Sequence, residues 1–351
     1  MQDSPPAGSR KQSQHLGKSS SNGGSSLQKG SGLRPAEIWG NDEFAFAYVD
    51  GWARLPSEVH LVECAGVAVD SKDNVYVLTR GDHPIVVLNS DGEVIRSFGY
   101  GNFSKRPHGI AITHDDVLLC VDDGLHTVQL FSTTGDLVLE LGQRNQPAPK
   151  WSGRPFNQPT SAAVSPSTGE IYVTDGYGNS CVHVFSPSGT LRRSWGSPGI
   201  DRGQFIRPHN VVIDGEERIY VADRECHRVQ VFDSDGRFIT MWNNIYRPDA
   251  MTLGTDGYMY IGELTCTMAG LEDAPGLGHR VGVYDLRGSL VCRFGTEEEG
   301  DGPGQFIAPH GVAVDSMGSL YIAETSFTIR GSVMKPPREY RSLSKYARVR
   351  R

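Results

Sequence analysis

One pattern of four short apolar runs is repeated six times along this 351-residue chain. The first run of each unit begins at Gly66, Gly109, Ser161, Asn210, Ala250 or Gly311. A glycine turn such as Asp91-Gly92 separates the third run from the fourth, which predicts four antiparallel strands per unit. Internal repetition of such units predicts an all-β fold, a six-bladed β-propeller with four-stranded antiparallel blades.

The two ends of the chain differ in composition from the repeats. Residues 1–43 are rich in Ser, Gly, Lys and Gln, which predicts a disordered tail, and the basic residues 335–351 predict a solvated tail. The propeller is therefore expected to span residues 44–334. Its last unit lacks a glycine turn after Glu324, whereas Phe44–Arg54 has a strand-turn-strand pattern around Asp50-Gly51. We expect this N-terminal element to complete the sixth blade, which removes an exposed sheet edge.

A Pro-His dipeptide precedes the first strand in every second unit, at His108, His209 and His310. The other three units have Ala65, Thr160 and Asp249 at that point. In a closed ring of six, alternate units lie about 120° apart, so the three imidazoles converge on one axis. Three histidines with an open fourth position are typical of catalytic zinc, although imidazole also suits copper, iron and nickel. The alternative is that each histidine only forms hydrogen bonds in its turn.

Loops after the second strand of each unit reach the same face as the histidines. Tyr177 lies between two glycines and is either a packed surface residue or a phenol whose pKa falls beside a cation. Arg80 and Arg224 either form ion pairs with Asp82 and Asp223 or clamp a substrate carboxylate.

Carboxylates near the histidines have several possible roles. Candidates to orient the rings are Asp122, Asp223 and Glu324. Asp249 is either an acid near a metal or, as we favour, a turn residue. The long segment 263–280 predicts a lid over the site.

Charge and cysteine content limit the partners and the compartment. The formal net charge of −7 argues against a nucleic-acid partner, because phosphate binding needs a basic face. The six cysteines form no CxxC pair, so buried thiols are favoured over a disulfide framework. No apolar run is long enough to cross a membrane, and residues 1–43 lack a secretory h-region.

The repeats resemble the NHL-repeat propeller family over about residues 44–330. The nearest likeness is to the peptidyl-α-hydroxyglycine α-amidating lyases, through motifs such as Arg80-Gly-Asp-His, Asp175-Gly-Tyr-Gly-Asn-Ser and Ala222-Asp-Arg-Glu. The resemblance implies zinc bound by His108, His209 and His310. It also implies Tyr177 as the catalytic base, with Arg80 and Arg224 in the site.

By this resemblance, the expected activity is a zinc-dependent lyase. It would cleave the N–C bond of an N-acyl-α-hydroxyglycine-like carbinolamide to give an amide and glyoxylate. The substrate would be a small molecule or a peptide C-terminus, with no nucleic acid and no membrane as partner.

The departures from the family are informative. Its disulfide positions correspond to Asn157 with Gly178 and Tyr220 with Val231, so both pairs are lost. Their loss favours a reducing, cytoplasmic compartment. Gly311 replaces an acidic residue that the family associates with a structural Ca²⁺, which argues against calcium here.

Two other functions compete with the lyase. A non-catalytic NHL scaffold would bind a protein on one face and hold no stoichiometric metal. A lactonase-type metal hydrolase is disfavoured because such sites are built from carboxylates and calcium.

Overall fold

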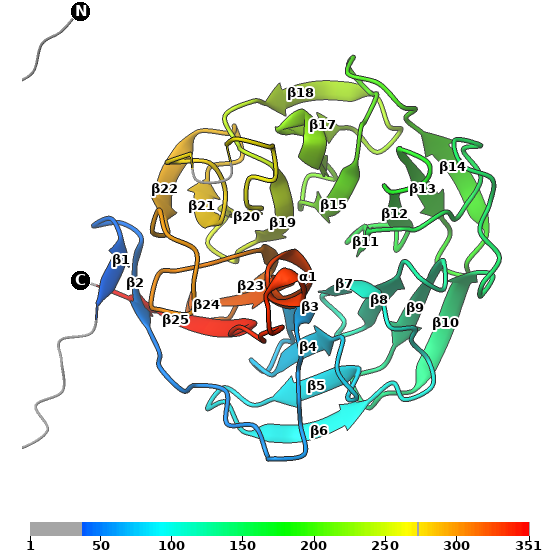
Figure 1. Ribbon diagram of the computed structural model, residues 1–351. Helices are drawn as coiled ribbons and strands as arrows, with labels where there is room; N and C mark the ends of the chain where they lie inside the picture. The colour runs from blue at the N-terminus through cyan, green and yellow to red at the C-terminus, as the bar shows by residue number, and fades with distance from the viewer. Residues whose placement is uncertain (1–36, 272–273, 351) are drawn as a thin grey trace, which may run out of the picture. The chain divides into compact units, whose positions relative to one another are not determined.

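The described part of the chain forms a ring of blades (Figure 1). The computed structural model describes residues 37–271 and 274–350. In these residues the strands form six sheets whose neighbouring strands are all antiparallel, five of four strands and one of five. The predicted six-bladed all-β propeller is confirmed.

Each blade runs from an innermost to an outermost strand. Blade one contains β3 (Cys64–Val69), β4 (Val75–Thr79), β5 (Ile85–Leu88) and β6 (Val94–Phe98). Blade two contains β7 (Pro107–Ile112), β8 (Leu118–Asp122), β9 (Thr127–Phe131) and β10 (Leu137–Gly142). Blade three contains β11 (Ser161–Val164), β12 (Ile171–Asp175), β13 (Cys181–Phe185) and β14 (Leu191–Trp195). Blade four contains β15 (Pro208–Ile213), β16 (Ile219–Asp223), β17 (Arg228–Phe232) and β18 (Phe238–Trp242). Blade five contains β19 (Pro248–Leu253), β20 (Met259–Glu263), β21 (Arg280–Tyr284) and β22 (Leu290–Phe294).

A repeated tyrosine explains much of the packing between blades. The second residue of the second strand is a fully buried tyrosine in five of the six blades, at Tyr76, Tyr172, Tyr220, Tyr260 and Tyr321. In three blades its hydroxyl donates to the aspartate that follows the first strand, as in Tyr220 to Asp214 at 2.9 Å. Burial of the apolar ring stabilises the fold. The hydroxyl has a hydrogen-bond partner, so its burial carries no penalty for an unpaired polar group.

The sixth blade joins both ends of the chain. Its strand order is β23 (Pro309–Val314), β24 (Leu320–Glu324), β25 (Leu343–Val349), β2 (Ala45–Tyr48) and β1 (Ile38–Gly40). Closure by the N-terminal segment is therefore confirmed, but the predicted strand positions were wrong. This segment supplies the fourth and a fifth strand, and the third strand comes from the C-terminal segment. Asp50-Gly51 is not the hairpin turn of this blade, because residues after it bond to blade one, as in Arg54 N to Gly92 O at 2.8 Å.

The prediction of a solvated tail over residues 335–351 was wrong for β25. Tyr346 is fully buried, and the basic side chains of the strand lie over aromatic rings. The Lys345 ammonium is 5.3 Å from the Trp52 ring centroid, and the Arg348 guanidinium is 4.1 Å from that of Phe44. Cation–π contacts and buried stems let a basic strand pack in a blade. At the other end, β1 extends the propeller to residue 38, and the prediction for residues 1–36 lies outside the described residues.

Two short helices connect β24 to β25. These are α1 (Ser326–Ile329) and the 3₁₀ helix η2 (Gly331–Val333). In Figure 1, α1 lies over the middle of the ring, where the first strands of the blades converge. Among the described residues, no helix has the length and apolar character needed to cross a membrane.

Candidate functional site

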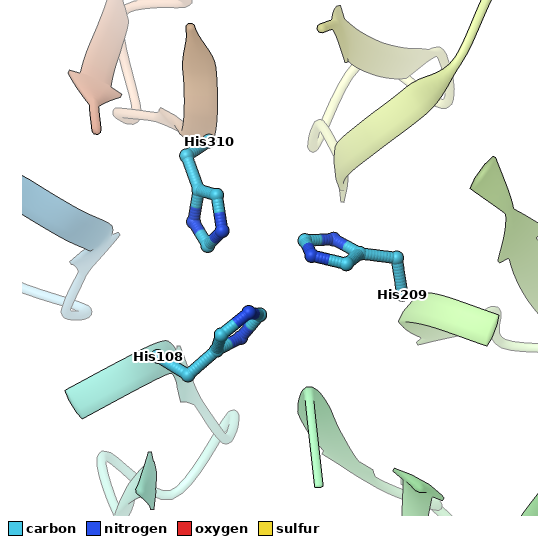
Figure 2. Close-up of side chains that lie close together, drawn as sticks. All are labelled: His108, His209 and His310. Atoms are coloured by element: carbon cyan, nitrogen blue, oxygen red, sulfur yellow. The ribbon is translucent and has the colours of Figure 1, made fainter. Parts of the chain in front are cut away.

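The three Pro-His histidines meet at the centre of the ring, as predicted. His108, His209 and His310 are the second residues of β7, β15 and β23, and all three are buried. Their ring centroids lie 4.7 to 5.0 Å apart. Figure 2 shows the rings pointing toward one another from three different blades. One ligand nitrogen from each ring lies within 4.8 Å of the other two.

The remaining three blades fix the orientation of these rings. Nδ1 of His108 lies 2.7 Å from the carbonyl oxygen of Thr160, and Nδ1 of His310 lies 2.7 Å from that of Ala65. Nδ1 of His209 lies 2.8 Å from the carbonyl oxygen of Asp249. A carbonyl oxygen can only accept a hydrogen bond, so Nδ1 carries the proton in each ring. The Nε2 lone pair is thereby left for a ligand.

The environment keeps the three imidazoles neutral. Burial lowers the pKa of His108 and His209 well below the ordinary value of 6.5, and nearby positive charge adds to the effect. Burial also lowers the pKa of His310. Metal ligation requires unprotonated imidazole nitrogens, and three of them converge here, so the residues fit a metal ion bound through three nitrogens.

The strands that carry the histidines approach their neighbours closely. A Cβ added at Gly311 would lie 2.7 Å from the Cα of Gly66 in blade one, and a Cβ added at Gly109 would lie 2.7 Å from the oxygen of Thr160. Gly109 and Gly311 therefore let these two strands lie close to the next blade, whereas Asn210 takes the same position after His209. A side chain at 311 would require the facing strand of blade one to shift.

The carboxylates that we expected to orient the rings act on the backbone instead. Asp122 accepts from the backbone nitrogen of Ser104 at 2.7 Å, Asp223 from those of residues 206 and 207, and Glu324 from those of residues 307 and 308. Each carboxylate therefore holds the loop that leads into a Pro-His dipeptide. In the described residues none of the three contacts an imidazole, so that prediction was wrong.

Tyr177 reaches the histidines from blade three. Its hydroxyl lies 2.9 Å from Nε2 of His108 and 3.2 Å from Nε2 of His209. Glycine on each side avoids clashes, because a Cβ at Gly176 would lie 2.1 Å from the oxygen of Pro208 and one at Gly178 would lie 2.5 Å from that of Asn157. Burial raises the pKa of Tyr177, and the positive charge of Arg224 acts against this effect. The protein alone thus favours the neutral phenol, so the predicted lowering of this pKa requires a stronger cation.

Arg224 is anchored by Asp249 and not by Asp223. Its Nη1 donates to Oδ1 of Asp249 at 2.8 Å and its Nε to Glu225 at 2.9 Å, whereas Asp223 pairs with Arg228. The same Oδ1 atom lies 3.1 Å from Nδ1 of His209. Asp249, which we favoured as a turn residue, therefore belongs to the site. It connects the guanidinium of Arg224 to one of the three imidazoles.

Arg80 also has a partner other than the expected one. Its Nη1 donates to Glu63 at 2.7 Å and to the hydroxyl of Thr328 on α1 at 3.1 Å. Asp82 instead approaches Lys105, and both of those side chains are exposed. Both arginines are thus present beside the histidines, and both ion-pair partners predicted for them were wrong.

A pocket of about 490 Å³ reaches one of the three histidines, His310. Tyr177, Arg80 and Arg224 also line it, and α1 contributes Phe327, Thr328 and Ile329 to its wall. Three further arginines also line the pocket, and they were not among the predicted site residues: Arg106, Arg207 and Arg247. Each precedes the proline that begins a first strand, so the Arg-Pro repetition was visible in the sequence. From the predicted lid 263–280, Leu264 and Thr267 reach the pocket, and lid function stays a prediction.

Glu225 serves three of these arginines at once. It accepts from Arg224 at 2.9 Å and from Arg247 at 2.9 Å, and Arg207 lies 3.3 Å away. Burial alone would raise the pKa of Glu225, but the hydrogen bond from Arg247 and the charges of Arg224 and Arg247 lower it to about 2. The carboxylate is therefore ionised, and the wall of the pocket is predominantly cationic.

The cysteines take no part in the site. All six are free thiols, and five of them are buried, as the sequence indicated. The two residue pairs that the resemblance suggested as disulfide positions are in contact. A Cβ at Gly178 would lie 2.2 Å from Oδ1 of Asn157, and Tyr220 is the cross-strand partner of Val231.

Comparison with known proteins agrees with this fold. The NHL repeat family matches residues 156–185 and 205–232. The chain contains NHL repeats. NHL repeat-containing protein 3 of Homo sapiens is 29% identical over 307 residues, which cover 82% of this chain and 84% of that protein. A solved streptogramin B lyase structure has a TM-score of 0.57 at 13% identity, covering 87% of this chain and 98% of that one, and it supports the fold alone.

A second relative bears on the chemistry. Peptidyl-alpha-hydroxyglycine alpha-amidating lyase 1 of Drosophila melanogaster is 32% identical over 243 residues, covering 64% of this chain and 43% of that protein. The NHL-repeat propeller therefore resembles amidating lyases, as its motifs indicated.

Proposed function

We propose that this NHL-repeat propeller is a zinc-dependent carbon–nitrogen lyase. Its substrate would be an N-acyl-α-hydroxyglycine-like carbinolamide, which it splits into an amide and glyoxylate. The observation that carries the proposal is the convergence of three neutral imidazoles with a tyrosine hydroxyl within 2.9 and 3.2 Å of two of them. The likeness to amidating lyases supports it.

His108, His209 and His310 would hold the metal through Nε2. Zinc is the metal proposed because a set of three histidines with an open position is typical of catalytic zinc. When bound, Zn²⁺ supplies a Lewis acid that lowers the pKa of hydroxyl groups beside it.

Tyr177 is the proposed base, and the arginines bind the substrate. The ionised Tyr177 oxygen takes the proton of the carbinol hydroxyl. The O–H electron pair forms the carbonyl of glyoxylate as the C–N bond breaks, and its electrons go to the amide nitrogen. Tyr177 then returns the proton to that nitrogen, so the reaction needs no other reactant. Arg80 and Arg224 bind the carboxylate that becomes part of glyoxylate. Glu63 holds the guanidinium of Arg80 in place, and Asp249 holds that of Arg224.

Release of glyoxylate from α-hydroxyhippurate tests the proposal. The zinc-loaded protein should give benzamide and glyoxylate in equal amounts and should not open a simple lactone. Lactone turnover without glyoxylate would instead support a hydrolase. No turnover of either compound by metal-loaded protein would leave the non-catalytic NHL scaffold as the better account.

A further inference from the structure

The arginines around the pocket differ in how fully their hydrogen-bonding groups are used. Arg106 makes two bonds to the buried carboxylate of Asp123, at 2.8 and 2.7 Å. Arg80 bonds to Glu63, Thr328 and the oxygen of Pro107. These contacts hold both guanidinium groups in fixed positions against the protein.

Arg207 is different. Its one ion pair among the described residues is the 3.3 Å contact to Glu225, and its side chain is 37% exposed. Its guanidinium carbon lies 5.0 Å from the ring centroid of Tyr177, which places it in the pocket beside the proposed base. A guanidinium in this position can form a bidentate pair with an incoming carboxylate.

The local charge favours such a ligand. Within residues 37–271 and 274–350, Arg207, Arg224 and Arg247 share two carboxylates, those of Glu225 and Asp249. Among the residues that line the pocket, Glu63 is the one acidic side chain. An uncharged apolar group placed against Arg207 would desolvate the guanidinium without pairing it, which is unfavourable.

We propose that Arg207 binds a second anionic group, on the acyl side of the substrate. This inference rests on the proposed function, in which Arg80 and Arg224 bind the hydroxyglycine carboxylate. The substrate class is then an N-acyl-α-hydroxyglycine whose acyl group ends in a carboxylate, as in an N-succinyl compound.

Binding of two inert analogues tests the proposal without turnover. N-succinylglycine and N-butanoylglycine share one carboxylate and the same acyl chain length, and only the first has a second carboxylate. By calorimetry, the protein should bind N-succinylglycine at least about tenfold more tightly, the gain expected from one charge-assisted pair. Arg207→Gln should remove most of this preference and leave the Kd of N-butanoylglycine unchanged. Arg287→Gln, at an exposed arginine in the outer hairpin of blade five, should change neither value.

Three results would overturn the proposal. These are equal binding of the two analogues, no binding of either, or an equal loss for both in Arg207→Gln, which would assign Arg207 to the shared carboxylate. The α-hydroxylated forms of both compounds separate this inference from the proposed function. If neither releases glyoxylate, the lyase proposal fails whatever the binding ratio. If both release it with equal kcat/KM, only the role of Arg207 fails.

Discussion

Removal of the Asp249 carboxylate should destabilise the protein far more than removal of an exposed carboxylate. Asp249 is fully buried and pairs with Arg224, whose side chain is 6% exposed, at 2.8 Å. Asp249→Ala leaves a buried guanidinium with Glu225 as its remaining carboxylate partner. Loss of one member of a buried pair costs about 3 to 5 kcal/mol. At an unfolding entropy of about 2.1 cal/mol/K per residue, a propeller of this size should show a fall in Tm of roughly 5 to 8 °C.

The backbone oxygen of residue 249 survives this substitution, so His209 keeps its Nδ1 partner. Asp249→Ala should therefore retain bound metal while KM for a carboxylate substrate rises, because Arg224 is no longer held. Urea or thermal unfolding measures the first effect, and metal analysis with steady-state kinetics measures the second.

Asp82→Ala is the matched control. Asp82 and Lys105 are 92% and 84% exposed and 3.7 Å apart, and exposed pairs contribute roughly 0 to 1 kcal/mol. A double-mutant cycle combines Asp249→Ala with Arg224→Met. The double variant should lose less unfolding free energy than the sum of the two single variants, by about 1 to 3 kcal/mol. A free energy of unfolding for Asp249→Ala within about 0.5 kcal/mol of the wild-type value would refute a buried ion pair at Asp249, because surface substitutions have effects of that size.

Three further predictions concern the base, the histidines and the closure of the ring. Tyr177→Phe should lower kcat by about 10²- to 10⁴-fold with metal content unchanged; unchanged kcat would remove Tyr177 as the base. The metal-free protein should lose stability as pH falls below 6.5, because His108 and His209 take up protons only when unfolded. The slope is about 1.4 kcal/mol per pH unit for each histidine, measured by urea unfolding, and His209→Gln should reduce it. A chain ending at Ser342 lacks β25 and should unfold or aggregate, which size-exclusion chromatography would detect; a stable monomer would contradict the assigned closure.

The sequence predicted those features that follow from the periodicity of the repeat. Histidines in every second unit of a six-unit ring must face one axis, so His108, His209 and His310 could be placed without coordinates. Their hydrogen-bond partners also fall on the alternate units, at Ala65 and Thr160, for the same geometric reason.

Contacts between distant segments could not be read in this way. Arg80 pairs with Glu63, and Arg224 pairs with Asp249 as well as with its neighbour Glu225, whereas the sequence had suggested Asp82 and Asp223. The strand β25 was hidden because its basic side chains resembled those of a solvated tail. Packing of Lys345 and Arg348 on aromatic rings depends on residues that are distant in sequence.

The central claim is that the three histidines hold a metal ion. The most direct measurement is the metal content of purified protein after equilibration with zinc and removal of excess, for the wild type, His209→Ala and the exposed-histidine control His114→Ala. We predict about one zinc per chain in the wild type and in the control, and loss of that zinc in His209→Ala. Absence of bound zinc in the wild type, or equal zinc in all three proteins, would contradict the assignment.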